Sequence, residues 1–386
     1  MTLLSDHLGV APEKRDMAWL MEALQSAIAL EHATLPLYLS AMFSLQVQGY
    51  TVYNLIRGVS MEEMVHMAIA CNIVAALGGT PQIAKLSPQF PSNGLPGGAE
   101  PDLHVVLAKV SKKQIRNFMR LEVPAFLLDP KYKTETYPTI AKLYAAIRGA
   151  IESNADAIRA AMKKGGASNQ VGDDIGFTTI TYTEGQDPLP QLYDALDEIV
   201  LQGEGSPSRT LHADQFEGEE SHYAKYAEIY YGRRYSRPQG HVVLTSETEK
   251  QFFEGYPIQP PEVENMLMVP SDGYEAALKA DPNGATVEAA MTVFDQAYTA
   301  IMSDLEAMWN GPSDQSWPKF GAAVGAMGDL RVLGCFNIMK YQVPQSVIAQ
   351  LKTLYPDEYD DLAAYTDLDA PVVYGPRFRN LNGGLS

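Results

Sequence analysis

A Glu-x-x-His pattern occurs twice in this chain, in segments that lie far apart in the sequence. The first, Glu63…His66, is in the apolar stretch SMEEMVHMAIACNIVAALGG, and the second, Glu219…His222, is in EESHYAKYAEI. Residues i and i+3 share one face of a helix, so a carboxylate and an imidazole at this spacing can bind one ion. Two such helices, with one further Glu from each of two others, form the dinuclear metal sites of four-helix bundles. The patterns therefore predict a mainly all-α chain around a dinuclear centre.

The ligand types favour particular metals. Hard carboxylate oxygens with one imidazole per metal suit iron or manganese, and they leave coordination positions open for oxygen. We therefore predict two iron ions per chain, or a mixed Mn/Fe pair.

Glu31 is the predicted carboxylate of the first helix. Leu24, Ile28 and Leu35 recur around it at helical spacings, so Glu31 projects from the apolar stripe of that helix. A buried carboxylate is costly unless a cation meets it, which favours a metal ligand over a snorkelling surface residue. Its neighbour His32 points elsewhere, and we expect it at the surface or supporting the ligands from outside.

The second single carboxylate has three candidates from the residues alone. Glu198 has an ordinary mid-helix position, and Glu204 lies in LQGEGS, where flanking glycines allow close approach of the backbone. Glu122, in FMRLEVPAF, sits between apolar neighbours and offers an extra ligand or a nearby acid.

Hydrophobic periodicity and breaker residues predict the elements. Residues 79–101 are rich in Pro, Gly, Ser and Asn and are expected to form an extended loop. Helices are expected over about 15–47, 52–77, 112–130, 139–164, 189–205, 211–232, 285–310 and 314–341, with short strands at 103–111 and 177–183. The segment SRPQGH is the predicted boundary between a metal-binding bundle (1–235, with an inserted loop and helix at 79–138) and a helical C-terminal region (236–386) packed on it.

Composition excludes several classes of function. The net charge of −18 argues against nucleic acid or an anionic membrane as a partner. Two cysteines give no disulfide framework, and no secretory signal or apolar run of about 20 residues is apparent, so we expect a cytoplasmic protein. Walker A, Rossmann and GxSxG motifs are missing from the sequence, as is the CxxCH motif of covalent haem attachment. Non-covalent haem leaves little sequence trace.

Five segments, in this order, carry a family resemblance: EHATLPLYLSAM, EEMVHMAIACNIVAALGGTP, FMRLEVP, IVLQGEGSPS and EESHYAKYAEI. They resemble the ferritin-like family of iminophenyl-pyruvate dimer synthases, which includes the imine-coupling enzymes of violacein and bisindole pathways. AMGDLRVLGCFNIMKYQVP and YGPRF are similar as well, so the resemblance covers most of the chain.

The resemblance implies a ferritin-like four-helix bundle, enlarged by insertions and an additional helical C-terminal region. It favours Glu204 over Glu198 and Glu122. The implied ligands are Glu31 and Glu204 as terminal ligands, Glu63 and Glu219 as bridging ligands, and His66 and His222 with one metal each. The pigment-pathway enzymes are much longer chains, so their particular substrate and reaction are not carried over.

The expected function is oxidation by O2 or peroxide of a small organic, amino-acid-derived molecule in secondary metabolism. In this hypothesis the 79–101 loop covers the mouth of the site, and the chain forms a homo-oligomer. The alternative is a ferritin-type protein that oxidises and stores iron without an organic substrate. A third interpretation is a binding module whose Glu-x-x-His pairs are incidental.

Overall fold

The computed structural model describes residues 2–46, 50–132, 137–165, 170–172, 178–204, 211–213, 219–239, 242–311 and 316–383. Two long helices, α2 (Met17–Phe43) and α3 (Thr51–Ala76), run antiparallel through its centre. Most side chains of both helices are buried, so they form the core rather than a surface layer. A short helix, α1 (Leu4–Gly9), packs against α2 and α5.

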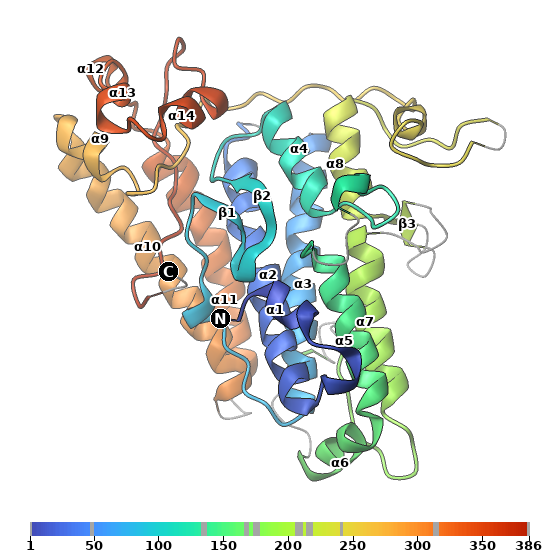
Figure 1. Cartoon of the computed structure of the whole chain (residues 1–386). Helices are drawn as coiled ribbons and strands as arrows, with labels where there is room; N and C mark the ends of the chain where they lie inside the picture. The colour runs from blue at the N-terminus through green and yellow to red at the C-terminus, as the bar shows by residue number, and fades with distance from the viewer. Residues whose placement is uncertain are drawn as a thin grey trace.

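Two interrupted columns of helix complete a four-column bundle around α2 and α3 (Figure 1). One column is α4 (Lys112–Leu121) followed by α5 (Ile140–Ser153), and the other is α7 (Leu189–Glu204) followed by α8 (His222–Tyr231). Helix α4 packs against α8, and α5 packs against α7. Helix α5 also contacts α2, while α7 and α8 contact α3. Both columns are therefore broken at about the middle of the bundle.

The ends of the central helices follow from local sequence signals. The side chain of Asp16 accepts a hydrogen bond from the backbone N–H of Trp19 at 2.9 Å and caps the start of α2. Helix α3 ends where Gly78 adopts a left-handed φ of 82°, with Gly78 N–H bonded to Ala75 O and Gly79 N–H to Val74 O. This is the Schellman arrangement that the Gly-Gly pair predicts.

Three predicted helices differ from those observed. The helix over 112–130 ends at Leu121, because Pro124 cannot continue it and disfavours helical geometry at the residue before it. The helix over 139–164 divides into α5 and α6 (Ala155–Gly165). The helix over 211–232 begins only at His222, and it is preceded by two short strands, β3 (His212–Ala213) and β4 (Glu219–Glu220).

The segment between α3 and α4 forms an antiparallel hairpin of β1 (Ser92–Leu95) and β2 (Ala99–Val105). Strand β2 therefore precedes most of the strand predicted at 103–111, and half of the predicted loop has regular structure. Residue 177 lies outside the described residues, and residues 178–183 do not form the predicted strand.

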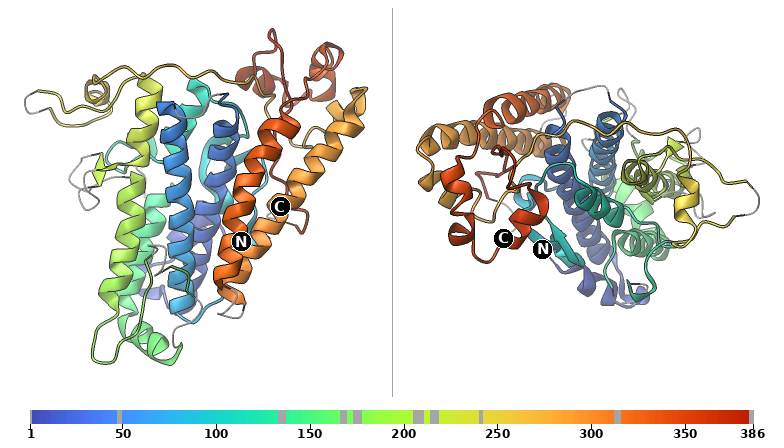
Figure 2. Two further views of the ribbon diagram at one scale, coloured as in Figure 1. Left: turned by 180° about the vertical axis from the view of Figure 1, so that it is seen from behind. Right: turned by 90° about the horizontal axis from the view of Figure 1, so that it is seen from above.

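The C-terminal helices lie along one flank of the bundle (Figures 1 and 2). Helices α10 (Gly284–Asn310) and α11 (Ser316–Val332) pair with each other, and a π-helical segment, Leu333–Ile338, follows α11. Trp309 donates to Asn72 of α3 at 2.8 Å, and Glu306 accepts from the backbone of Ile83 and Ala84, so α10 is fixed to the bundle. The remaining helices are α9 (Glu275–Ala280), α12 (Gln345–Ile348), α13 (Leu351–Leu354) and α14 (Tyr359–Tyr365). The division into two regions near residue 236 stays a prediction.

His32 is fully buried, so the expectation of a surface position is wrong. Its Nε2 lies 2.9 Å from the hydroxyl of Tyr298 in α10, and burial lowers its pKa to about 4. His32 therefore stays neutral at pH 7 and joins α2 to the C-terminal helices.

Helix α3 is long and apolar enough to cross a membrane by length and composition alone. However, 78% of its most apolar window is buried inside the protein, as in the core helix of a globular fold.

Candidate metal centre

Five side chains of types that can bind a metal meet where the two outer columns are interrupted. Glu31 comes from α2, and Glu63 and His66 come from one face of α3. Glu122 is the first residue after α4, and His222 is the first residue of α8. All five side chains are buried, so the interruptions place polar groups inside the bundle rather than at its ends.

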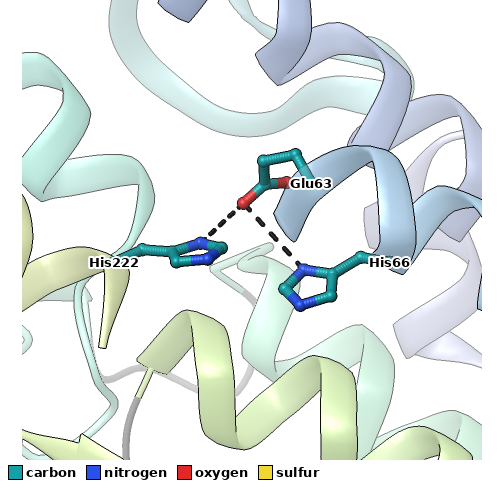
Figure 3. A group of neighbouring side chains, drawn as sticks. All are labelled: Glu63, His66 and His222. Atoms are coloured by element: carbon teal, nitrogen blue, oxygen red, sulfur yellow. Dashed lines mark ion pairs between the residues drawn. The ribbon is translucent and has the colours of Figure 1, made fainter. Parts of the chain in front are cut away.

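The two histidine rings face a single carboxylate oxygen (Figure 3). Oε1 of Glu63 lies 2.7 Å from Nδ1 of His222 and 4.0 Å from Nδ1 of His66. Nδ1 of His66 also lies 3.9 Å from Oε2 of Glu31. The rings are stacked, with centroids 5.2 Å apart, and both present Nδ1 to the carboxylates.

The outer nitrogen of each ring is held by an oxygen acceptor. Nε2 of His66 donates to Oε1 of Gln202 at 2.8 Å, and Nε2 of His222 donates to Oε2 of Glu62 at the same distance. Glu62 is itself held by the ammonium of Lys225 at 2.6 Å. Metal-binding histidines usually donate their second ring N–H to such an acceptor, which fixes the ring and keeps the other nitrogen for the metal. Both rings have this arrangement.

Three carboxylates surround the inner nitrogens. The hydroxyl of Tyr144 donates to Oε1 of Glu31, and the hydroxyl of Tyr38 donates to Oε1 of Glu122. The other oxygen of Glu122, Oε2, lies 3.5 Å from Nδ1 of His222.

Glu63 is anchored by Thr34, whose hydroxyl lies 3.1 Å from Oε2 of Glu63. One oxygen of each of these three carboxylates is thus held by a hydroxyl, and the second faces the histidines.

Burial makes this concentration of negative charge costly. It raises the pKa of Glu31 well above its usual range, and the charge of Glu63 adds to the effect. Burial, together with the charge of Glu122, also raises the pKa of Glu63. Carboxyl groups of this kind take up protons unless a cation neutralises them, so the site favours bound cations.

The two histidines respond to burial in opposite directions. Burial lowers the pKa of His66 to about 4, although Glu31 opposes the shift. Burial also acts to lower the pKa of His222, but Glu63, Glu122 and Glu62 outweigh it and raise that pKa well above its ordinary value. His222 is therefore the group that carries positive charge among the carboxylates when no metal does.

The cavity between these side chains is small. Its volume is about 30 Å³, and Glu31, Glu63, His66 and Glu122 line it. One water needs roughly 10–15 Å³ of such a volume, so the cavity accommodates ions or a few waters, but no organic molecule. None of residues 79–101 lines it, and whether this loop covers the mouth of the site stays a prediction.

The donor set fits a metal. One ligand atom each of Glu63, His66 and His222 lies within 4.8 Å of the others, all buried. Nδ1 of His222 has no hydrogen-bond partner of acceptable geometry, despite its short distance to Glu63. Buried carboxylate oxygens and imidazole nitrogens that converge in this way are what a hard or borderline divalent metal requires.

The other predicted ligands fall into two groups. Glu198 lies apart from the cavity and accepts a hydrogen bond from Thr178, so it is not part of the cluster. Glu204 ends α7 and Glu219 begins β4, but both side chains lie outside the described residues, and their roles stay predictions.

The second Glu-x-x-His pattern does not lie on one helix. Ser221 caps the start of α8, with its hydroxyl accepting from the N–H of Ala224 at 3.3 Å, so Glu219 precedes the helix that His222 begins. The assumption that Glu219 and His222 share a helical face is therefore wrong. A serine before a helical run is a signal for such a start.

Sequence reasoning missed Gln202, Tyr144 and Thr34. Gln202 contacts His66, while Tyr144 and Thr34 contact carboxylates. No motif marks these residues, because each reaches the site through the packing of a different helix.

Gln202→Leu tests the support of His66. The variant removes the acceptor of Nε2, so the ring loses its fixed orientation, and we expect iron affinity to fall about 10–100-fold. Metal titration by isothermal calorimetry measures the change. Gln191→Leu on the same helix, where the side chain contacts Thr181, is the matched control and should leave the affinity unchanged. An unaltered affinity in Gln202→Leu would show that this hydrogen bond does not orient a metal ligand.

Comparisons with known proteins agree with the helical bundle. A model of the ferritin-like family matches residues 24–231, which contain every residue of the cluster. The chain belongs to the ferritin-like family, and the predicted ferritin-like fold is confirmed.

Among solved structures, the chain is similar to a ferritin-like protein from Caulobacter vibrioides. The identity is 18% and the TM-score is 0.54, over 83% of this chain and 96% of that chain. At this identity the likeness concerns the fold alone. No curated protein matches the chain.

Proposed function

We propose that this protein is a non-haem dinuclear iron oxidoreductase that uses O2 or peroxide to oxidise a small organic molecule. One observation carries the proposal: Nδ1 of His66 and Nδ1 of His222 both face Oε1 of Glu63 inside the bundle, while each Nε2 is held by an acceptor. A purely structural role for these polar groups does not require this shared orientation, whereas holding metal ions between them does.

The chain's own residues have distinct roles in this proposal. Glu31 and His66 would hold one metal ion and Glu122 and His222 the other, while Glu63, whose carboxylate faces both histidines, would serve both. When bound, a pair of iron ions, or a mixed Mn/Fe pair, supplies the oxidising chemistry with O2 or peroxide.

The residues around the ligands keep the site dry and control protons. The hydroxyls of Tyr144 and Tyr38 each hold a proton at a carboxylate oxygen, on Glu31 and Glu122 respectively. Glu62 is partly exposed and connects Nε2 of His222 to solvent, and the charges of His222 and Lys225 lower its pKa to about 2 although burial opposes them. Glu62 therefore stays ionised and holds the ring proton of His222 in place.

Glu204 and Glu219 complete the proposed set of ligands. Gly203, next to Glu204, lines the cavity, and a Cβ at this glycine would lie 3.8 Å from Oε2 of Glu122. The end of α7 thus reaches the cavity, which supports Glu204 as a ligand.

The resemblance of five sequence segments to iminophenyl-pyruvate dimer synthases supports a more specific proposal. It suggests an amino-acid-derived substrate in secondary metabolism. Separately, the composition favours a cytoplasmic location, and we propose that the chain forms a homo-oligomer. The sequence segments that carry this resemblance include Glu31, Glu63, His66, Glu122 and His222, so it concerns the same cluster.

Metal analysis of the purified protein tests the proposal. We expect about two iron or manganese ions per chain, and an anomalous-scattering map should place them about 3.5–4 Å apart beside Glu63. A preparation loaded with Fe²⁺ under anaerobic conditions that binds no metal would refute it.

Iron oxidation and storage is the second candidate, because the cavity holds ions but no organic molecule. A storage protein of this type assembles into a large cage, so size-exclusion chromatography with light scattering separates the two functions. A small oligomer that does not accumulate iron beyond about two ions per chain would exclude storage.

A further inference from the structure

A second pocket adjoins the metal-site cavity on the side of the break between α4 and α5. Its volume is about 180 Å³. Leu121 and Ile140 line both this pocket and the metal-site cavity, so the two hollows adjoin at these two side chains. Leu121 is also the neighbour of Glu122 in the chain. The side chains of Leu121 and Ile140 therefore separate the pocket from the cavity that the proposed ligands line.

The pocket wall is largely apolar. Besides Leu121 and Ile140, it is formed by Val123, Ala125, Leu128 and Ala141, with Thr139, Glu100 and Lys142 as its polar members.

The polar members of the wall are engaged by protein groups. Oε2 of Glu100 accepts from Nε and Nη2 of Arg120 and from the hydroxyl of Tyr137, each at 3.2 Å. Nζ of Lys142 donates to the backbone carbonyl of Tyr137 at 2.7 Å. These contacts occupy the charged groups, so the pocket offers an entering molecule mainly apolar surface.

Its size indicates what can enter. An apolar protein cavity of about 150 Å³ accommodates a benzene molecule. A pocket of about 180 Å³ therefore has room for one six-membered ring or a branched aliphatic chain, whereas the metal-site cavity has room for neither. Of these two adjoining hollows, the pocket is the one that an organic molecule fits.

We propose that this pocket, between residues 121–128 and the start of α5, binds the organic substrate, and that the part bound is an apolar group of about one ring. Leu121 and Ile140 form a removable wall, since a change of side-chain rotamer at either position joins the pocket to the metals. This inference rests on the proposed function, because it assigns the substrate position of the same centre.

Benzyl alcohol serves as the probe, with protein loaded with Mn²⁺ or Zn²⁺. Saturation-transfer NMR measures binding of the probe, for which we expect a Kd on the order of 1 mM. Relaxation of the probe's ring protons, compared between the paramagnetic Mn²⁺ form and the diamagnetic Zn²⁺ form, measures proximity to the metals. Metal content is measured on the same samples.

Ala141→Phe places a ring inside the pocket and should weaken probe binding by about 10-fold or more, with metal content unchanged. Ala145→Phe, on the exposed side of the same helix, is the matched control and should stay within about 2-fold of the native protein. Ala125→Phe, at an exposed position of the pocket rim, repeats the test if Ala141→Phe does not fold.

Leu121→Ala removes part of the wall and should increase the relaxation of the bound probe by Mn²⁺. If metal is bound but the probe does not bind, or binds equally well to Ala141→Phe and Ala125→Phe, the pocket assignment is wrong and the proposed function is unaffected. If the native protein binds no metal, the proposed function fails, and the pocket loses its assignment as a substrate site even when the probe binds.

Discussion

The double variant Glu63→Ala, His66→Ala is expected to contain less than about one tenth of the metal of the native protein. Oε1 of Glu63 faces Nδ1 of both histidines, so its loss removes the shared ligand, and the loss of His66 removes one of the two imidazoles. To retain both metals, the remaining carboxylates and His222 would have to replace both Glu63 and His66 as ligands. Elemental analysis of protein expressed with added iron measures the change.

Glu198→Ala is the control for this variant. It also removes a carboxylate from a bundle helix, but Glu198 contacts Thr178 and does not line the cavity, so the metal content should be unchanged. Circular dichroism of both variants checks that the bundle has formed. A double variant that folds and still holds about two metals per chain would mean that the proposed site is wrong.

Arg377→Ala is expected to lower the free energy of unfolding by about 3–5 kcal/mol. The guanidinium is buried and bonds Asp295 of α10 through Nε at 2.7 Å, and it holds Glu288 at 2.9 Å. Asp295 is fully buried, so removal of the arginine leaves its carboxylate without its ion-pair partner, with the backbone N–H of Arg379 still donating to it. Thermal unfolding monitored by circular dichroism should show a decrease in Tm of roughly 5 °C or more.

Lys279→Ala provides the comparison. Lys279 forms an exposed ion pair with Glu275, and solvent screening leaves such pairs little effect on stability. Its Tm should therefore stay close to that of the native protein. Equal decreases in Tm for the two variants would indicate that the buried Arg377 contacts stabilise the fold no more than an exposed ion pair does.

The long helices and half of the metal centre could be predicted from local sequence. The apolar periodicity around Glu31 predicts a helix with a carboxylate on its buried face, and Glu31 is buried there. Glu63 and His66 are one helical turn apart in α3, so their convergence depends only on the geometry of a single helix. These predictions needed no knowledge of the neighbouring helices.

The second half of the centre depends on chain breaks that are weak signals in the sequence. Pro124 prevents α4 from continuing, so the helix ends at Leu121 and Glu122 comes to face His222. Ser221 caps the start of α8, so His222 is the first residue of that helix and comes to face Glu63. The helical pattern of 211–232 gave the wrong start, since apolar spacing there continues upstream of the cap. Insertion or deletion of one residue at either break would rotate these side chains by about 100° around the helix axis.

The sequence by itself therefore determined the fold class, the positions of the central helices and the convergence of Glu63 and His66 on one buried helix face, with Glu31 on the buried face of another. Only the tertiary structure decided that Glu122 and His222 join them, that Glu198 does not, and that Gln202, Tyr144 and Thr34 hold the ligands in place. The physical reason is the range of the interactions. Helical periodicity is set by neighbours three and four residues away, whereas these contacts join different helices, whose relative position follows from the packing of the whole bundle.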